Sequence, residues 1–129
     1  GKGNDYLNWL GIWKRNIELG LTTWAEDSNV EGTRSDCHAW GASPNIEFFR
    51  IILGIQSAAP SFRKVRIEPH LGSFRQISGK MPHPHGMIEV QYDVDKRQAM
   101  ISLPEKTTGT FVWKGVSSVL KAGVNRVRI

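Results

Sequence analysis

The sequence is poor in residues and patterns that mark several common classes of protein. Cys37 is the one cysteine among 129 residues, which excludes an internal disulfide and a metal cluster built from cysteine alone. The first methionine is Met81, and no basic stretch leading into an apolar segment is present that would indicate a targeting peptide. No run of 18 apolar residues occurs, which argues against a membrane-spanning helix.

Motifs of phosphate-, serine- and metal-dependent chemistry are missing as well. The sequence has no glycine-rich phosphate loop after a strand and no serine nucleophile elbow. His83 and His85 flank a proline but lack a third ligand at a recognisable spacing, so a turn is the better interpretation. We therefore expect no metal and no other cofactor. For Cys37 we expect a small buried residue, not a nucleophile.

The chain starts with Gly1 and carries its charge unevenly. Because no methionine opens it, we expect a segment of a longer protein. The sequence leaves the compartment of that protein open, with a periplasmic or secreted location favoured over a cytoplasmic one. Residues 1–59 hold five Lys/Arg and seven Asp/Glu, a net charge of −2, whereas residues 60–129 hold twelve and five, a net charge of +7. The basic half could face polyanions. Its cations are spread among strand-like residues, so a solvated surface without nucleic-acid or membrane partners is favoured.

Residues 1–59 have helical periodicity on either side of a loop. A helix is predicted from a cap at Asn4 or Asp5 to Leu19, with Gly20 placed to end it. The polar stretch 21–43 predicts a loop. Ser43 and the following proline open a second helix, which is apolar nearly all round over 46–53 and is therefore expected to be buried on most sides.

Residues 60–129 change to a period of two. Short alternating segments, about seven in number, are separated by turn residues such as those at 82–86 and 104–109. Regular short strands with this punctuation predict an antiparallel β-sandwich. The sequence thus predicts an α+β protein with two parts, helices in 1–59 and a sandwich in 60–129.

The loop between the helices holds the densest set of reactive side chains. Glu26 and His38 lie there with the indoles of Trp24 and Trp40. Indoles stack on the apolar face of a sugar ring, and carboxylates and imidazole bind its hydroxyls. Each of these residues alone is more often structural, but their clustering in a loop between buried helices favours a sugar site.

In this loop the sequence resembles glycoside hydrolase family 78, the bacterial and fungal α-L-rhamnosidases. The likeness rests on residues 20–26 (Gly-Leu-Thr-Thr-Trp-Ala-Glu) and on residues 35–44 (Ser-Asp-Cys-His-Ala-Trp-Gly-Ala-Ser-Pro). Residues 60–69 and 84–90 also look like the family's junction and tail. The likeness covers essentially the whole chain, although the strands alone are weak support.

The resemblance implies two helices from the end of an (α/α)6 barrel, followed by a carboxy-terminal β-sandwich. It implies an inverting hydrolase of terminal α-L-rhamnosyl linkages, in which Glu26 matches the general base. His38 matches a residue lining the rhamnose site, and Trp24 and Trp40 are transferred less firmly as walls of that site. Nothing in the chain matches the general acid, so we expect it to be inactive alone and to self-associate through helix faces that lack their neighbours.

Two other functions remain open on the sequence. Another (α/α)6 glycosidase would share the helices and the sandwich but not the Ser-Asp-Cys-His-Ala-Trp motif of residues 35–40. A non-catalytic β-sandwich that binds carbohydrate or polyanions would account for the basic half but would leave the loop with Glu26 and His38 unexplained.

Overall fold

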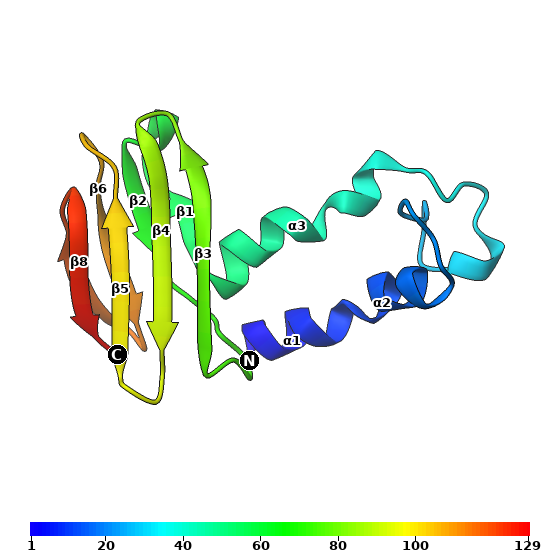
Figure 1. The fold of residues 1–129 in the computed structure, drawn as a ribbon, viewed down its shortest axis with the longest axis horizontal. Coiled ribbons are helices and arrows are strands. Elements are labelled where there is room, and N and C mark those ends of the chain that lie inside the picture. The colour runs from blue at the N-terminus through cyan, green and yellow to red at the C-terminus, as the bar shows by residue number, and fades with distance from the viewer.

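The computed structural model describes all 129 residues and confirms the α+β fold of helices followed by a β-sandwich. A helical arm, residues 2–53, projects from one side of the sandwich (Figure 1). The loop between its helices lies at the end of the arm away from the sheets. No helix of the structure combines the length and the apolar character needed to cross a bilayer.

The first helical segment is broken once and starts earlier than predicted. α1 spans Lys2–Trp9 and α2 spans Gly11–Glu18, with Leu10 between them. Asn4 and Asp5 therefore lie inside α1 and cap nothing, which corrects the predicted start. Gly20 does end the segment, with a φ of +74° that favours glycine.

The second helical segment winds more loosely than an α-helix at its end. α3 covers Pro44–Glu47 and continues as a π-helical turn, Phe48–Ile52, in which the Leu53 N–H bonds to the Phe48 carbonyl at 2.9 Å. Ser43 makes no capping hydrogen bond with its side chain, contrary to prediction. Ile46 is 51% exposed, so this chain alone does not bury the apolar segment on most sides.

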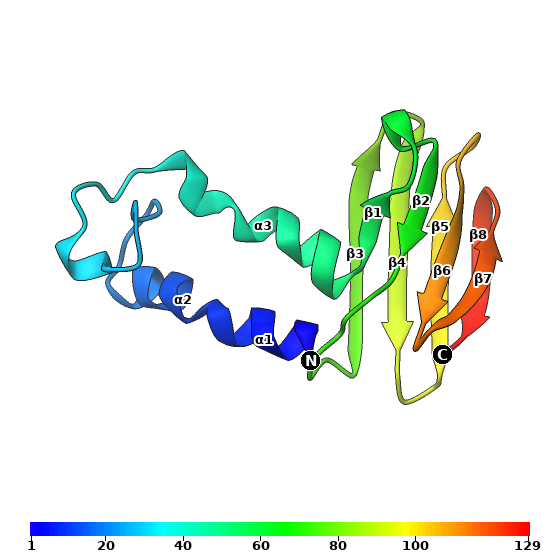
Figure 2. The same ribbon diagram turned by 180° about the vertical axis from the view of Figure 1, so that it is seen from behind.

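Eight strands form two sheets that pack face to face (Figure 2). The first sheet has the order β1-β2-β6-β7 and the second the order β3-β4-β5-β8. Their bounds are β1 Ile55–Ser57, β2 Lys64–Ile67, β3 Gln76–His83, β4 Gly86–Asp93, β5 Gln98–Leu103, β6 Thr108–Trp113, β7 Val116–Leu120 and β8 Gly123–Arg128. All neighbours are antiparallel, as predicted for the sandwich, except β2 and β6, which run parallel.

Strands β1 and β3 were not predicted. β3 carries Ile77 and Met81 on its inner face, but Gly79 and Pro82, two residue types that are rare in strands, weaken its sequence signal. β1 is only three residues long, and it pairs with β2 across the predicted boundary at residue 59. The turn predicted over 82–86 is present but shorter, since only Pro84 and His85 lie between β3 and β4.

The core lies between the sheets and reaches the base of the arm. Alternate residues of the strands point inward, and thirteen buried apolar residues form one cluster. Tyr92 is 1% exposed, and its hydroxyl donates to the Leu53 carbonyl at 2.8 Å, which joins the second sheet to the end of the π-helical turn. Burial raises the pKa of Tyr92, so this hydroxyl stays a donor.

Both helical segments of the arm are attached to the sandwich at its base. The His70 N–H bonds to the Ile51 carbonyl at 3.0 Å, and the Glu68 N–H bonds to the Gly54 carbonyl at 2.9 Å. On the other helix, Gly3 lies so close to the main chain of His70 that a Cβ would be 2.1 Å from its carbonyl oxygen. The arm is thus fixed to the sandwich through α1 and through the residues that follow α3.

Candidate functional site

The loop that carries the predicted site is tied to α2 through a buried asparagine. Asn16 is 2% exposed; its amide donates to the Ile12 carbonyl and its oxygen accepts the Ala25 N–H, both at 2.9 Å. The Glu26 N–H then bonds to the Ser35 carbonyl at 2.9 Å, which closes the loop on itself. Asn16 therefore places the residue that directly precedes Glu26.

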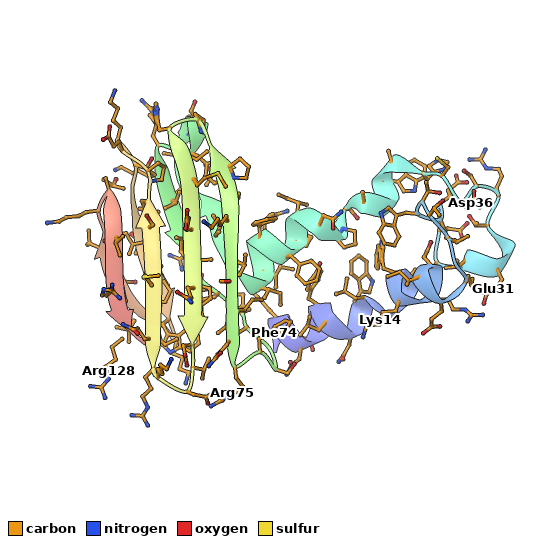
Figure 3. All side chains as sticks on the ribbon, viewed as in Figure 1. Lys14, Glu31, Asp36, Phe74, Arg75 and Arg128 are labelled. Atoms are coloured by element: carbon orange, nitrogen blue, oxygen red, sulfur yellow. The ribbon has the colours of Figure 1, made fainter.

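Residues 30–36 form the outer end of the loop. Figure 3 shows Glu31 and Asp36 at this end of the arm, remote from Arg75 and Arg128 on the sandwich. A short 3₁₀ turn, Val30–Gly32, buries Val30 there. Arg15 of α2 reaches Glu31 through two hydrogen bonds of 2.7 and 2.5 Å, so α2 also supports the loop at this end.

Glu26 is partly enclosed and holds an arginine. Its side chain is 17% exposed. Arg34 grips it with two hydrogen bonds, from Nε to Oε2 at 3.0 Å and from Nη2 to Oε1 at 2.5 Å. This fork is the geometry in which arginine binds carboxylates most strongly.

His38 and Trp40 lie beside the same carboxyl group. The His38 Nε2 is 3.8 Å from Oε1 of Glu26, and the rings of His38 and Trp40 are 4.2 Å apart. The Trp40 indole N–H donates to the Glu26 main-chain carbonyl at 2.7 Å while the side chain as a whole is 61% exposed. The structure therefore brings a carboxylate, an imidazole and an exposed indole together.

Trp24 is placed differently from the other three predicted residues. It is half-buried and packs so closely on Gly41 that a Cβ there would lie 2.4 Å from its own Cβ. With Trp13 and Phe48 it lines an apolar cavity of about 200 Å³ between the helices. Its main-chain carbonyl accepts the His38 N–H at 3.0 Å, so Trp24 contributes to the position of His38.

The charges around Glu26 favour its ionised form. The hydrogen bonds from Arg34 lower the pKa of the Glu26 carboxyl, partial burial opposes that shift, and the charges of Arg34 and His38 lower the pKa further. The group is therefore a carboxylate at neutral pH and can accept a proton. In contrast, Nδ1 of His38 is buried without a hydrogen-bond partner.

Sequence reasoning missed two residues at this site and misplaced a third. Asn16 is a polar residue of a helix, and its sequence neighbours give no reason to expect that it is buried. Arg34 lies eight residues after Glu26 in an irregular loop, where a spacing of eight does not indicate contact. Cys37, which precedes His38, is exposed and not buried as predicted. No group of three His, Cys, Asp or Glu side chains is placed to hold a metal ion.

Several known proteins share this fold. Residues 54–127 match the family model of the bacterial alpha-L-rhamnosidase C-terminal domain. The α-L-rhamnosidase of Aspergillus terreus superposes with a TM-score of 0.73 at 20% identity, over 91% of this chain and 15% of its own. The enzyme of Dictyoglumus thermophilum gives 0.72 at 20% identity, over 87% and 16%.

A third structure, the α-L-rhamnosidase of Streptomyces avermitilis complexed with L-rhamnose, gives a TM-score of 0.70 at 18% identity, over 88% of this chain and 14% of its own. The chain thus spans about 15% of the length of these enzymes. A search of curated protein sequences finds no match. The family model covers more than half of the chain and includes every strand of the sandwich except the last residue of β8, so the chain belongs to the family of bacterial α-L-rhamnosidase C-terminal domains.

Proposed function

We propose that the chain is the carboxy-terminal part of an inverting α-L-rhamnosidase and that Glu26 is the general base of that enzyme. The substrate would be a glycan or glycoside with a terminal α-L-rhamnosyl group. The helical arm would complete an (α/α)6 barrel, and the sandwich would follow it. This chain covers only about 15% of the length of the related enzymes, which supports a longer parent protein.

One observation carries the proposal: an ionised carboxylate lies within 4 Å of an imidazole and beside an exposed indole at the end of the arm. Inverting hydrolysis needs a carboxylate that takes a proton from water and a second carboxyl group, roughly 6.5–9.5 Å away, that protonates the leaving oxygen. Glu26 has the ionisation state that the first role requires.

The other residues have roles that follow from their chemistry. The exposed face of Trp40 suits the apolar face of a sugar ring, and His38 suits a sugar hydroxyl. As the base takes the proton, the water oxygen forms its bond to the anomeric carbon while the glycosidic bond breaks. The carboxylic acid that protonates the leaving oxygen is expected in the upstream part of the enzyme.

The test is Glu26→Gln in the full-length enzyme. The amide keeps the shape of the side chain but accepts no proton, so we expect turnover of an α-L-rhamnoside to fall by about 10²- to 10⁴-fold. Because Glu31 lies in the same loop and is also bound by an arginine, Glu31→Gln is the matched control, and its turnover should stay close to that of the unmodified enzyme.

Near-normal turnover by Glu26→Gln would show that Glu26 is not the base. A panel of nitrophenyl glycosides tests the sugar as well. Activity on a glucoside in place of the rhamnoside would favour another (α/α)6 glycosidase over the enzyme proposed here.

A further inference from the structure

We propose that Arg34 is a positioning residue for Glu26. The Arg34 guanidinium holds one edge of the Glu26 carboxylate and leaves Oε2 of Glu26 as the oxygen that takes the proton from water. This inference rests on the proposed role of Glu26 as the base.

The geometry restricts how the carboxylate can be used. A carboxylate offers about four lone-pair positions, two on each oxygen. The Arg34 fork occupies one position on each oxygen, at 3.0 Å on Oε2 and 2.5 Å on Oε1. His38 also approaches Oε1, at 3.8 Å, which leaves Oε2 with the more accessible free lone pair.

The fork also fixes the plane of the carboxylate. Two parallel hydrogen bonds from a planar guanidinium define both the position and the rotation of the group that accepts them. A single ammonium group fixes neither, because it binds as a point charge. A base must meet its water in one orientation, and a displacement of 1 Å can reduce a rate by about 100-fold.

Apart from His38, no charged group besides Arg34 acts on Glu26. Of the neighbouring carboxylates, Asp27 accepts the Asn29 N–H at 2.9 Å, and Glu31 is bound by Arg15. Because Arg34 itself is 79% exposed in its side chain, it can be replaced without disturbing a packed core.

The arrangement predicts a specific change in pH dependence. Arg34 lowers the pKa of Glu26, so without it the carboxylate would become protonated at a higher pH than in the unmodified enzyme. The acid limb of kcat/KM would then move to higher pH. A residue that only supported the loop would lower the rate equally at every pH.

The experiment compares Arg34→Gln and Arg34→Lys with a control, Arg15→Gln. The control removes the arginine of α2 that binds Glu31 in the same loop. The pKa of Glu26 is measured by NMR of its carboxyl carbon in the 129-residue chain. The pH profile of kcat/KM is measured in the full-length enzyme with a nitrophenyl α-L-rhamnoside.

For Arg34→Gln we expect a higher Glu26 pKa and an acid limb displaced upward by the same amount. For Arg34→Lys we expect a smaller displacement with a plateau that falls by up to about 100-fold, since the charge remains but the fork is lost. Arg15→Gln should change neither quantity.

An unchanged Glu26 pKa in Arg34→Gln would overturn the inference, whatever the rates. An acid limb that stays in place while Glu26→Gln is inactive would also overturn it and would leave the proposed function standing. If Glu26→Gln keeps full turnover, the proposed function fails by itself, and the NMR titration still decides whether Arg34 controls Glu26.

Discussion

Gly54 joins the helical arm to the sandwich, and replacing it by alanine should be far more damaging than the same change at Gly20. Both glycines have a φ of +74°, so each replacement carries the same left-handed penalty of about 1–2 kcal/mol. Both also gain about 0.4–1 kcal/mol because alanine restricts the unfolded chain. The two positions differ in the space around them.

At Gly54 a Cβ would lie 2.2 Å from the carbonyl carbon of Glu68 and 2.3 Å from the Pro69 nitrogen, whereas nothing lies within 4 Å of a Cβ at Gly20. The atoms at Gly54 are main chain and cannot turn away, so β1 and β2 would have to separate. Forcing an extra methyl group into such a site costs about 1–3 kcal/mol or more. At about 4 °C per kcal/mol for a chain of this size, Gly54→Ala should melt about 4–12 °C below Gly20→Ala.

Urea and thermal unfolding measured by two probes would check this. Tryptophan fluorescence reports mainly the arm, since Trp113 is the one tryptophan in the sandwich, and circular dichroism reports both parts. Coincident transitions would justify comparing the two variants as two-state folders. Equal losses of stability in Gly54→Ala and Gly20→Ala would refute the steric argument.

Three further outcomes are expected. Asn16→Ala removes the acceptor of the buried Ala25 N–H and should cost about 1–3 kcal/mol in urea unfolding; an unchanged midpoint would mean that the loop does not depend on Asn16. The pKa values of Glu26 and Glu31 are lowered in the folded state, so the stability that these two carboxylates contribute is present above the ordinary pKa of 4.5 and is lost as pH falls below it. Thermal unfolding from pH 7 to pH 3 should show this loss of stability, and the loss should be less steep in Arg34→Gln. An equal loss in Arg34→Gln and in the unmodified chain would contradict it. The side chains of Trp9, Ile17 and Ile46 are more than half exposed, so the isolated chain should self-associate in light scattering, and a monomer at high concentration would count against it.

Much of the fold could be predicted because periodicity records burial. The alternation in β4 and β5 matches inward residues such as Val90 and Ile101, which are almost fully buried. β3 escaped prediction since Gly79 packs against Leu53 and supplies no side chain to the pattern. The parallel β2–β6 pair depends on a connection through β3, β4 and β5, which no local pattern encodes.

The residue types of the candidate site could be read from the sequence, but the contacts between them could not. Glu26, His38 and Trp40 were identified from their composition and from resemblance, and the structure places them together. Their organisation depends on Arg34 and Asn16, whose hydrogen bonds join irregular main chain. An irregular loop has no sequence periodicity, so which residues contact one another in it can be seen only in the structure.

The attachment of the arm at its base has a mechanical consequence. The base of the arm is held by the contact of Gly3 with His70 and by the hydrogen bond of Tyr92 to Leu53, while Glu26 lies near the opposite end. A change in the angle of the arm at this anchorage would move its far end more than its base, so the packing at the sandwich contributes to the position of Glu26. Substitutions beside His70 or Leu53 would then displace the loop without touching a single one of its residues.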